Sequence, residues 1–469
     1  MSATLAAPPR TTTRPNLVVL VLALGGIVVS LMQTLVVPLI PKLPALLGAT
    51  PADATWVITA TLLASAVATP VVGRLGDMYG KRRLLLVSLV LLVAGAVVAA
   101  LSDTLTPMIV GRALQGLAAG VIPLGISIMR DELPADRLGS ATATMSASLG
   151  VGGALGLPAA AFLAENTDWH VLFWTAAGLG VLVTALVLIF VPESNVQARG
   201  RFDFVGAAGL SVALVCLLLA ISKGAAWGWT SGATLGLFGV SAAVLLLWGW
   251  WELRSGSPLV DLRTTARRQV LLTNLTSAVF AFAMFAMQLV LPQILQLPVA
   301  TGHGLGQSLL VTGLVLVPSG LVMLMIAPLS ARITATAGPK VTLMLGVLVV
   351  AAGYGIGVVL MSAVWQLLLV SAVIGAGIGL AYGAMPALIM GAVPVSETAA
   401  ANSLNTLMRA IGTSVSSAVA GAILAQLIVP FGPSAVPSET AFRLIMALGC
   451  ATALTALAIA AFIPGAAKR

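Results

Sequence analysis

Two arginines interrupt long apolar stretches of this sequence, and they are the first candidates for chemistry. Arg112 lies inside the apolar run 108–128, and Arg409 lies inside the run 399–429. A charge at the centre of an apolar membrane helix costs at least about 2.5 kcal/mol, so each arginine needs a partner, a water-filled space or a ligand. Snorkelling to the outer boundary is the structural alternative for Arg112.

Arg409 belongs to a stripe of polar side chains on one helical face. Asn402, Asn405, Arg409, Thr413 and Ser416 recur at helical spacing. A polar stripe on a helix in lipid must face protein or water. We therefore expect 399–429 to line a central cavity.

Four further side chains are candidates to line the same cavity, namely Gln33, Met284, Phe285 and Gln288. Methionine and aromatic side chains suit varied apolar ligands, although the same residues could serve only to pack helices. The first apolar run and the apolar runs of the second half of the chain lack acidic residues at their centres. Two buried arginines without nearby acids would repel cations. The expected substrate is therefore a neutral or anionic hydrophobic small molecule.

A charged, glycine-containing segment follows the second apolar run and reads GRLGDMYGKRR from Gly73. Gly73 and Gly80 permit close helix approach and a tight turn. Asp77 places a carboxylate at the membrane boundary. That carboxylate could meet the positive N-terminal end of the helix 399–429 or the basic cluster formed by Lys81, Arg82 and Arg83.

The fifth apolar run carries small residues at Gly150, Gly153 and Gly156, followed by Pro158. Small residues allow two helices to pack closely, and such a seam suits helices that slide past one another. Ordinary tight packing is the alternative reading.

The composition defines the elements that must position these residues. Hydrophobic residues make up 59% of the 469 positions and charged residues 8%, and the mean hydropathy is +1.10. About a quarter of a soluble domain is charged, so lipid must cover this chain. The net charge of +9 comes from short loops, which argues against nucleic acid as a partner. Neither the two cysteines nor the two histidines are spaced as metal ligands, so we expect no metal and no cofactor.

The chain contains fourteen apolar runs long enough to span a bilayer as helices. They cover residues 17–40, 54–72, 84–101, 108–128, 139–163, 171–191, 204–221, 233–251, 270–297, 308–329, 341–361, 366–390, 399–429 and 441–463.

The basic residues orient these spans. With the N-terminus inside, eighteen of the 23 Lys and Arg residues lie in inside segments, and two lie within spans. The other three, outside, are Lys42, Lys223 and Arg443. The positive-inside rule then predicts that both termini are cytoplasmic.

An internal repeat divides the fourteen spans. The segment after span 2 aligns without gaps with the segment after span 10, pairing Pro70 with Pro328 and Gly80 with Gly338. Repeats of this kind build two bundles that rock around a midplane site. We predict an all-α membrane fold with a cytoplasmic tail (1–16), an N-terminal six-helix bundle (17–192), an inserted helix pair (203–252) and a C-terminal six-helix bundle (270–464).

The segment from Gly73 to Arg83 resembles the loop signature of the major facilitator superfamily, and the resemblance covers the whole chain. Arg112-ALQG is similar to the superfamily's Arg-x-x-Gln-Gly signature, and the glycine run of span 5 is similar to its antiporter signature. The fourteen spans resemble its drug:proton antiporter group. The resemblance implies gating by the Asp77 segment and proton coupling through Arg112, Gln115 and Gly116.

The resulting expectation is a secondary active exporter of hydrophobic small molecules, coupled to proton influx by alternating access. Proton-coupled uptake of a small organic solute is the alternative. No nucleophile or metal cluster lies within the spans, so an enzyme is not expected. We expect a monomer in a bacterial cytoplasmic membrane, with lipid and protons as its other partners. The candidate proton-binding acids are Asp77, Asp131, Glu132, Glu165 and Asp168.

Overall fold

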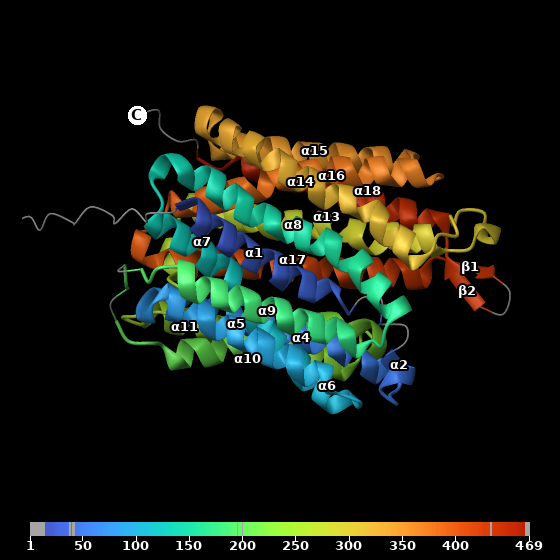
Figure 1. Ribbon diagram of the computed structural model, residues 1–469, viewed down its shortest axis with the longest axis horizontal. Helices are drawn as coiled ribbons and strands as arrows, with labels where there is room; N and C mark the ends of the chain where they lie inside the picture. Colours follow the sequence, from blue (N-terminus) through green and yellow to red (C-terminus); the bar gives the residue numbers. More distant parts are fainter. Residues whose placement is uncertain are drawn as a thin grey trace, which may run out of the picture.

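Fourteen long helices lie side by side along one axis of the molecule (Figure 1). The computed structural model describes residues 15–36, 39, 43–194, 196–198, 200–431 and 434–464. Of the predicted tail 1–16, the structure describes only residues 15 and 16, and Lys42 also lies outside the described residues. Each long helix has at least 20 residues and is apolar, which is enough to cross the roughly 30 Å hydrocarbon core. All fourteen predicted spans are therefore confirmed as membrane-length helices.

The long helices keep the order of the predicted spans. They are α1 (Pro15–Thr34), α4 (Trp56–Tyr79), α5 (Lys81–Ala100), α6 (Leu105–Gly116) continued through η2 (Leu117–Gly120) into α7 (Val121–Glu132), α8 (Ala135–Asn166), α9 (His170–Phe190), α10 (Phe204–Trp227), α11 (Gly232–Arg254), α13 (Arg268–Gln296), α14 (Leu309–Ala337), α15 (Pro339–Val359), α16 (Val364–Met390), α17 (Thr398–Gln426) and α18 (Glu439–Ala461). Short elements connect them: α2 (Leu43–Leu46), α3 (Pro51–Ala54), α12 (Leu262–Thr265), η3 (Val299–Thr301), η4 (Val395–Glu397), β1 (Ile428–Phe431) and β2 (Ser434–Pro437).

The segments predicted as loops after spans 2 and 10 are almost entirely helical. α4 continues past the predicted end at residue 72, and Gly80 alone separates it from α5. Gly338 likewise separates α14 from α15. Both glycines have positive φ, 112° and 89°, a conformation that residues with a Cβ rarely adopt. Since Pro70 and Pro328 also lie inside the corresponding helices, the two aligned segments have the same shape.

The predicted thirteenth span is wrong at its C-terminal end. α17 stops at Gln426, and Ile428 pairs with Pro437 in the antiparallel hairpin β1–β2. Pro430 lacks the N–H that another helical turn would need, and Ile428 and Val429 are β-branched residues that favour a strand. The sequence did not indicate the end of the helix, because the apolar run continues through the first residues of the hairpin.

Buried apolar side chains form two large clusters that follow the two halves of the sequence. One cluster joins α1 and α4–α9 and also includes Met390 of α16 and Ala399 of α17, and the other joins α13–α18. α8 contributes Ala143, Ala147 and Leu157 to the second cluster, so this helix packs against both halves. The domain limits 17–192 and 270–464 stay predictions.

α10 and α11 attach to the outside of this arrangement. Leu210, Leu214 and Leu218 of α10 pack against Ala66 of α4 and Leu407 of α17, so α10 covers a line where the two halves meet. The Nζ atom of Lys223 lies 4.5 Å from the centre of the Trp56 ring and also donates a hydrogen bond to Thr55. α11 is the least buried of the fourteen spans. The limits 203–252 of the inserted pair stay a prediction.

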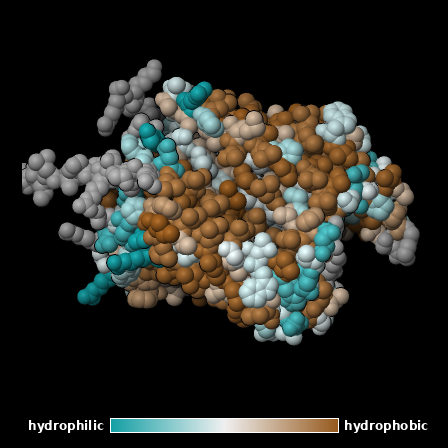
Figure 2. Space-filling model, viewed as in Figure 1, coloured by the Kyte–Doolittle hydropathy of each residue, from teal (hydrophilic) through white to brown (hydrophobic). Residues whose placement is uncertain are grey.

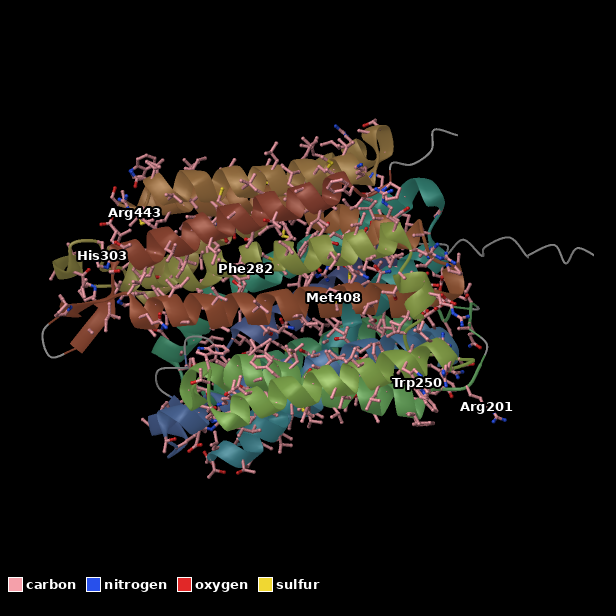
Figure 3. All side chains as sticks on the ribbon, turned by 180° about the vertical axis from the view of Figure 1, so that it is seen from behind. Arg201, Trp250, Phe282, His303, Met408 and Arg443 are labelled. Carbon is pink, nitrogen blue, oxygen red and sulfur yellow. The ribbon has the colours of Figure 1, made fainter. Side chains whose placement is uncertain are left out.

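The surface matches a protein surrounded by lipid. A broad hydrophobic band covers the visible middle of the molecule, and hydrophilic residues gather towards its two ends (Figure 2). Arg201 and Trp250 lie at one end and His303 and Arg443 at the other (Figure 3). We call the first end the Asp77 end, because the turn between α4 and α5 lies there. The assignment of this end to the cytoplasm stays a prediction.

α8 and α14 pack closely because both carry small residues at the contact. A Cβ atom added to Gly320 of α14 would lie 2.5 Å from Cβ of Ala154 and 2.6 Å from the carbonyl oxygen of Gly150. Further along, a Cβ atom on Gly313 would lie 2.8 Å from the backbone of Pro158. Backbone atoms cannot move aside as a side-chain terminus can, so these glycines set the distance between the helices.

The exchange Gly320→Ala is expected to destabilise the protein. The new methyl group must push α8 and α14 apart, and overpacking of this kind typically costs about 1–3 kcal/mol. Thermal unfolding of the purified protein should show an apparent Tm lowered by several degrees. The matched control is Gly355→Ala on α15, where an added Cβ atom meets nothing within 4 Å. A control that loses as much stability as Gly320→Ala would contradict this account of the contact.

Candidate functional site

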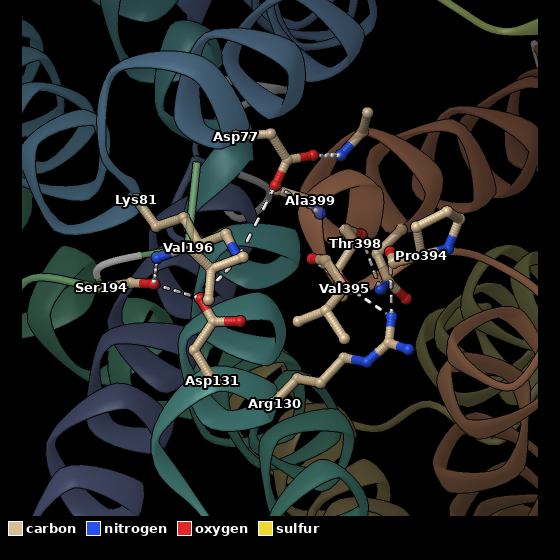
Figure 4. A network of polar contacts seen from close by, with 12 residues as sticks. Asp77, Lys81, Arg130, Asp131, Ser194, Val196, Pro394, Val395, Thr398 and Ala399 are labelled. Carbon is tan, nitrogen blue, oxygen red and sulfur yellow. Dashed lines mark hydrogen bonds and ion pairs between the residues drawn. The ribbon is translucent and has the colours of Figure 1, made fainter. Parts of the chain in front are cut away.

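A network of charged groups joins the two halves at the Asp77 end (Figure 4). The carboxylate of Asp77 on α4 accepts hydrogen bonds from the backbone N–H groups of Ala399, at 3.2 Å, and Ala400, at 2.8 Å. These are among the first N–H groups of α17, which have no partner within their own helix. The negative charge also meets the positive end of the α17 dipole. Asp77 is completely buried, so water does not compete for these bonds.

Lys81 and Asp131 extend this network within the first half. The Nζ atom of Lys81 lies 2.5 Å from a carboxylate oxygen of Asp131 and 3.8 Å from Asp77. Ser194 donates a hydrogen bond of 2.5 Å to the same oxygen of Asp131. Lys81 is 0% exposed, and a buried ammonium group requires such partners. The lysine therefore ties α4, α5 and α7 together beneath Asp77.

Arg130 makes a second connection between the halves. Its guanidinium donates to the Thr398 hydroxyl at 2.6 Å, and to the carbonyl oxygens of Met390 at 2.7 Å, Val393 at 3.1 Å and Pro394 at 3.5 Å. These acceptors lie at the end of α16 and the start of α17. The sequence analysis counted Arg130 only among the basic residues of the inside segments. Its position in an Arg-Asp-Glu cluster at the end of a span could have indicated a polar contact there.

The remaining members of the basic cluster do not reach Asp77. Arg82 donates from its side chain to the Leu188 carbonyl at 2.6 Å, and its backbone N–H donates to Glu193 at 3.2 Å. Arg83 is mostly exposed and lies 3.8 Å from a carboxylate oxygen of Glu193. Of the two contacts expected for Asp77, the one with the N-terminal end of α17 is present. Of the basic cluster, only Lys81 lies within ion-pair distance of Asp77 in the described part of the chain.

Gly73 accounts for the closeness of α4 and α17 at this point. A Cβ atom on Gly73 would lie 2.6 Å from Cβ of Ser403 and 2.8 Å from the carbonyl oxygen of Ala399. Only a residue without a side chain allows Asp77 to reach the end of α17. The two halves are thus in contact at the Asp77 end in this conformation.

Arg112 is held inside the first half. It is 2% exposed and so does not snorkel. Its guanidinium donates to the Gln115 side chain at 2.7 Å and to the carbonyl oxygens of Met32 at 3.2 Å and Val57 at 3.4 Å. Gly116 lies so close to α4 that an added Cβ atom would be 2.4 Å from the nearest backbone oxygen. The Arg-x-x-Gln-Gly segment therefore ties α6 to α1 and α4.

The glycines of the predicted α8 seam serve two different contacts. Gly150 and Pro158 meet α14, whereas Gly156 meets α1, where an added Cβ atom would lie 1.9 Å from the Thr34 hydroxyl oxygen. At Gly153 the nearest atom to an added Cβ is 3.6 Å away. α8 is thus closely packed between a helix of its own half and a helix of the other half.

Arg409 lies beside an aromatic ring that the sequence did not single out. Its guanidinium carbon is 4.8 Å from the centre of the Tyr382 ring, and its nitrogens donate to Asn405 at 3.4 Å and Thr406 at 3.1 Å. The Tyr382 hydroxyl donates to the sulfur of Met284 at 2.8 Å. Within the described residues, no carboxylate lies within ion-pair distance of Arg409. Tyr382 was missed because it stands among glycines and alanines in an apolar run.

Asn405 anchors this cluster to α13. Its side-chain nitrogen donates to the Asn274 oxygen at 2.9 Å and to the Ser277 hydroxyl at 2.8 Å. Asn402, by contrast, donates back to the Thr398 carbonyl of its own helix. We call Met284, Tyr382, Asn405 and Arg409 the Arg409 cluster.

The structure does not bring every predicted cavity residue into this cluster. The side chains of Gln33 and Gln288 are exposed, and that of Phe285 is half-buried. In the part of the chain that the structure describes, none of the three makes a hydrogen bond or ring contact with the Arg409 cluster. Their role in a substrate cavity stays a prediction.

Asp168 is poorly suited to carry a proton near neutral pH. Hydrogen bonds from the His170 backbone N–H, at 2.8 Å, and from its ring lower the pKa of this exposed carboxyl below its ordinary value. The carboxyl therefore stays ionised as pH falls towards neutrality. The side chain of Glu165 lies outside the described residues. The side chains of Asp77 and Asp131 are buried and both lie within 4 Å of the Lys81 ammonium group, whereas Glu132 is half-buried.

Fourteen membrane-length helices, two related halves and a charged contact between the halves define a multi-pass membrane transporter rather than an enzyme. The sequence signature of the Major Facilitator Superfamily matches residues 22–417, and the chain belongs to that superfamily.

Several bacterial relatives are similar over most of this chain. An MFS-type transporter of Mycobacterium tuberculosis is 28% identical over 419 residues, or 87% of this chain. The match covers 59% of that relative, so the chain spans about three-fifths of its length. The Multidrug resistance protein 3 of Bacillus subtilis is 25% identical, with 87% of this chain and 79% of the relative covered. The Tetracenomycin C resistance and export protein of Streptomyces glaucescens is 28% identical, with 88% and 76% covered.

Solved structures share the fold. The human organic anion transporter MFSD10 (TETRAN) superposes with a TM-score of 0.69 at 16% identity, covering 96% of this chain and all of that one. The proton:xylose symporter XylE gives a TM-score of 0.64 at 15% identity, covering 96% of both chains. At these identities the likeness concerns the fold alone.

The exchange Asp77→Asn is expected to loosen the contact between α4 and α17. The exchange removes the negative charge at the α17 N-terminus, while Lys81 still has Asp131 as its ion-pair partner. Loss of a helix cap costs about 0.5–2 kcal/mol, which corresponds to roughly a 2- to 30-fold change in an equilibrium between conformations. The measurement is the rate of maleimide labelling of Ser403→Cys, which replaces a completely buried residue, in protein lacking Cys216 and Cys450. Labelling should accelerate several-fold.

The matched control is Asp103→Asn. The Asp103 side chain is 87% exposed, and the loss of its charge should leave the labelling rate unchanged. If Asp77→Asn protein is labelled no faster than this control, Asp77 does not hold the two helices together.

Proposed function

We propose that the protein is a secondary active exporter of hydrophobic small molecules, driven by proton influx through alternating access. The observation that carries this proposal is the pair of contacts at the Asp77 end. Both Asp77 and Arg130 bind the first turn of α17 or the segment before it, so the halves can separate there only when these bonds break. The names of the relatives as resistance and export proteins support export as the direction.

The Arg409 cluster supports a neutral or anionic substrate. The cluster offers a guanidinium, an aromatic ring and a thioether sulfur, which together suit an apolar body that bears an electron-rich or negative group. A cation would meet the charge of Arg409 with no carboxylate within ion-pair distance in the described part of the chain. Repulsion in such an environment is much stronger than in water.

Asp77 is the proposed proton-binding group. Protonation of Asp77 would remove the charge that stabilises the α17 N-terminus. This loss weakens the contact between the halves, so proton binding would favour opening of the Asp77 end. Arg112 and Gln115 would then act by holding α1, α4 and α6 as one body.

The proposed orientation places the Asp77 end in the cytoplasm of a bacterium, with both termini on that side of its cytoplasmic membrane. An even number of spans places Pro15 and Ala461 at the same end of the molecule. We also propose that the protein works as a monomer. Its helices pack within one chain. The outer faces of α11 and α14 are apolar, with Leu246 and Met325 each 77% exposed, as suits surfaces that contact lipid.

Transport of neutral, anionic and cationic dyes in inside-out vesicles tests this proposal. Neutral and anionic dyes should accumulate inside, and a protonophore should abolish the accumulation because it removes the proton gradient. Dye counterflow that ignores an imposed pH gradient would contradict proton coupling. Movement of dye out of the vesicles, with protons, would favour uptake by symport instead.

The exchange Arg409→Ala tests the preference for anions. The binding affinity for an anionic dye should fall at least tenfold, or about 1.4 kcal/mol, while that for a cationic dye should be equal or higher. The control is Arg443→Ala at the opposite end, an exposed residue paired with Glu439 at 2.7 Å. Unchanged anion affinity together with good cation binding would rule out a role for Arg409 in substrate charge selection.

A further inference from the structure

A cavity of about 530 Å³ lies at the Asp77 end, outside the contact between Asp77 and α17. Its walls come from α4, from the segment between α9 and α10, from the segment between α11 and α13, and from η4 and α17. This volume is in the range of small-molecule sites. The lining is mixed, with hydroxyl and amide groups beside apolar side chains, and includes Arg74, Ser257, Asp261, Ser396, Glu397 and Leu404.

Arg74 is the unexplained group in this cavity. The residue is 8% exposed, and its Nε atom is buried without a hydrogen-bond partner. Among the described residues, its guanidinium makes neither a hydrogen bond nor an ion pair. A guanidinium carries five N–H donors, and burying such a charge unpaired is costly. The cavity beside it is the place where a partner would bind.

The two acids of the cavity do not neutralise Arg74. Both carboxylate oxygens of Asp261 already accept hydrogen bonds at the start of α12, from the backbone of Arg263 and from Thr264. Glu397 is half-buried and, in the described part of the chain, accepts no hydrogen bond. It also lies more than 4 Å from any nitrogen of Arg74. The cavity thus holds a cation and a carboxylate that are separate, and neither side chain has a hydrogen-bond or ion-pair partner among the described residues.

We propose that this cavity binds a small organic oxyanion, a phosphate or carboxylate, whose body also carries an ammonium group. The oxyanion would accept paired hydrogen bonds from Arg74, as guanidinium groups commonly donate to such anions. The ammonium group would lie against Glu397. A simple inorganic anion would satisfy Arg74 alone, whereas a simple cation would satisfy Glu397 alone.

Such a ligand would act on the conformational equilibrium. Arg74 belongs to the first half, and Glu397 belongs to η4, directly before α17 in the second half. A ligand that contacts both binds best when the halves touch, and it therefore favours that conformation. Binding here is independent of which substrate the protein carries, so a transport assay is not needed to detect it.

Two kinds of molecule carry both an oxyanion and an ammonium group and could reach the cavity, because it lies near the membrane boundary. One is a soluble phosphorylated amine, and the other is the headgroup of an aminophospholipid. The soluble arm of the test uses isothermal titration of the purified full-length protein in detergent with O-phosphoethanolamine, inorganic phosphate and ethanolamine. The lipid arm uses native mass spectrometry of protein from nanodiscs that contain phosphatidylethanolamine or phosphatidylcholine.

The variants are Arg74→Gln, Glu397→Gln and the control Arg332→Gln. Arg332 is the counterpart of Arg74 in the internal repeat and has an exposed side chain. Arg74→Gln should weaken O-phosphoethanolamine binding at least tenfold or remove one retained phosphatidylethanolamine. Glu397→Gln should weaken the same probe while leaving inorganic phosphate unchanged. Arg332→Gln should behave as the unmodified protein in both arms.

The result of the two arms identifies the source. Loss of binding in the soluble arm assigns a soluble ligand, and loss of a retained lipid assigns the headgroup. The proposal is overturned if Arg74→Gln matches the control in both arms, or if the unmodified protein binds no probe and retains no additional phosphatidylethanolamine.

Discussion

The carboxylate of Asp77 at the start of α17 is the interaction on which this conformation depends. It joins the second span to the thirteenth through two backbone N–H groups that no residue of α17 can satisfy. Gly73 allows the approach, and Gly80 turns the chain so that Lys81 points back beneath the carboxylate. Because the acceptors and donors belong to different halves, each bond formed here is lost when the halves separate. A buried contact of this type is either formed or broken, and packed contacts of this kind are bistable rather than continuously deformable.

The other arginines of the helix bundle differ in how their charges are satisfied. Arg112 is surrounded by carbonyl oxygens and an amide of its own half, so motion between halves leaves its hydrogen bonds intact. Arg130 reaches across the halves, as Asp77 does, and its four acceptors include three backbone carbonyls. Arg409 and Arg74 are different, since neither has a charged partner within ion-pair distance among the described residues. In a membrane protein, a charged side chain without an oppositely charged partner is a candidate place for a ligand or water.

The sequence predicted the fourteen spans because apolar length is a strong signal and each span is long enough to be counted alone. It also predicted that Asp77 could meet α17, since the acid stands at the membrane boundary and a helix end attracts it. The acceptors of Arg130 were not predictable, because they are backbone carbonyls that carry no mark in the sequence. Tyr382 was not predicted as a site residue, because it stands in an apolar run that carries no other polar signal. The helical continuation of α4 through Gly73 was missed because glycine and charge together resemble a loop, whereas packing against α17 stabilises the helix.

The position of α10 has a consequence for how the two lines of contact between the halves face the bilayer. α10 covers the line along which α4 and α17 meet, so a molecule dissolved in the bilayer encounters this helix before it reaches that line. On the flank where α8 meets α14, Leu155 and Leu321 are 40% and 46% exposed, and the surrounding hydrocarbon touches both helices directly. The inserted pair therefore makes the two flanks unequal, since an additional helix separates the bilayer from only one of the two lines of contact between the halves.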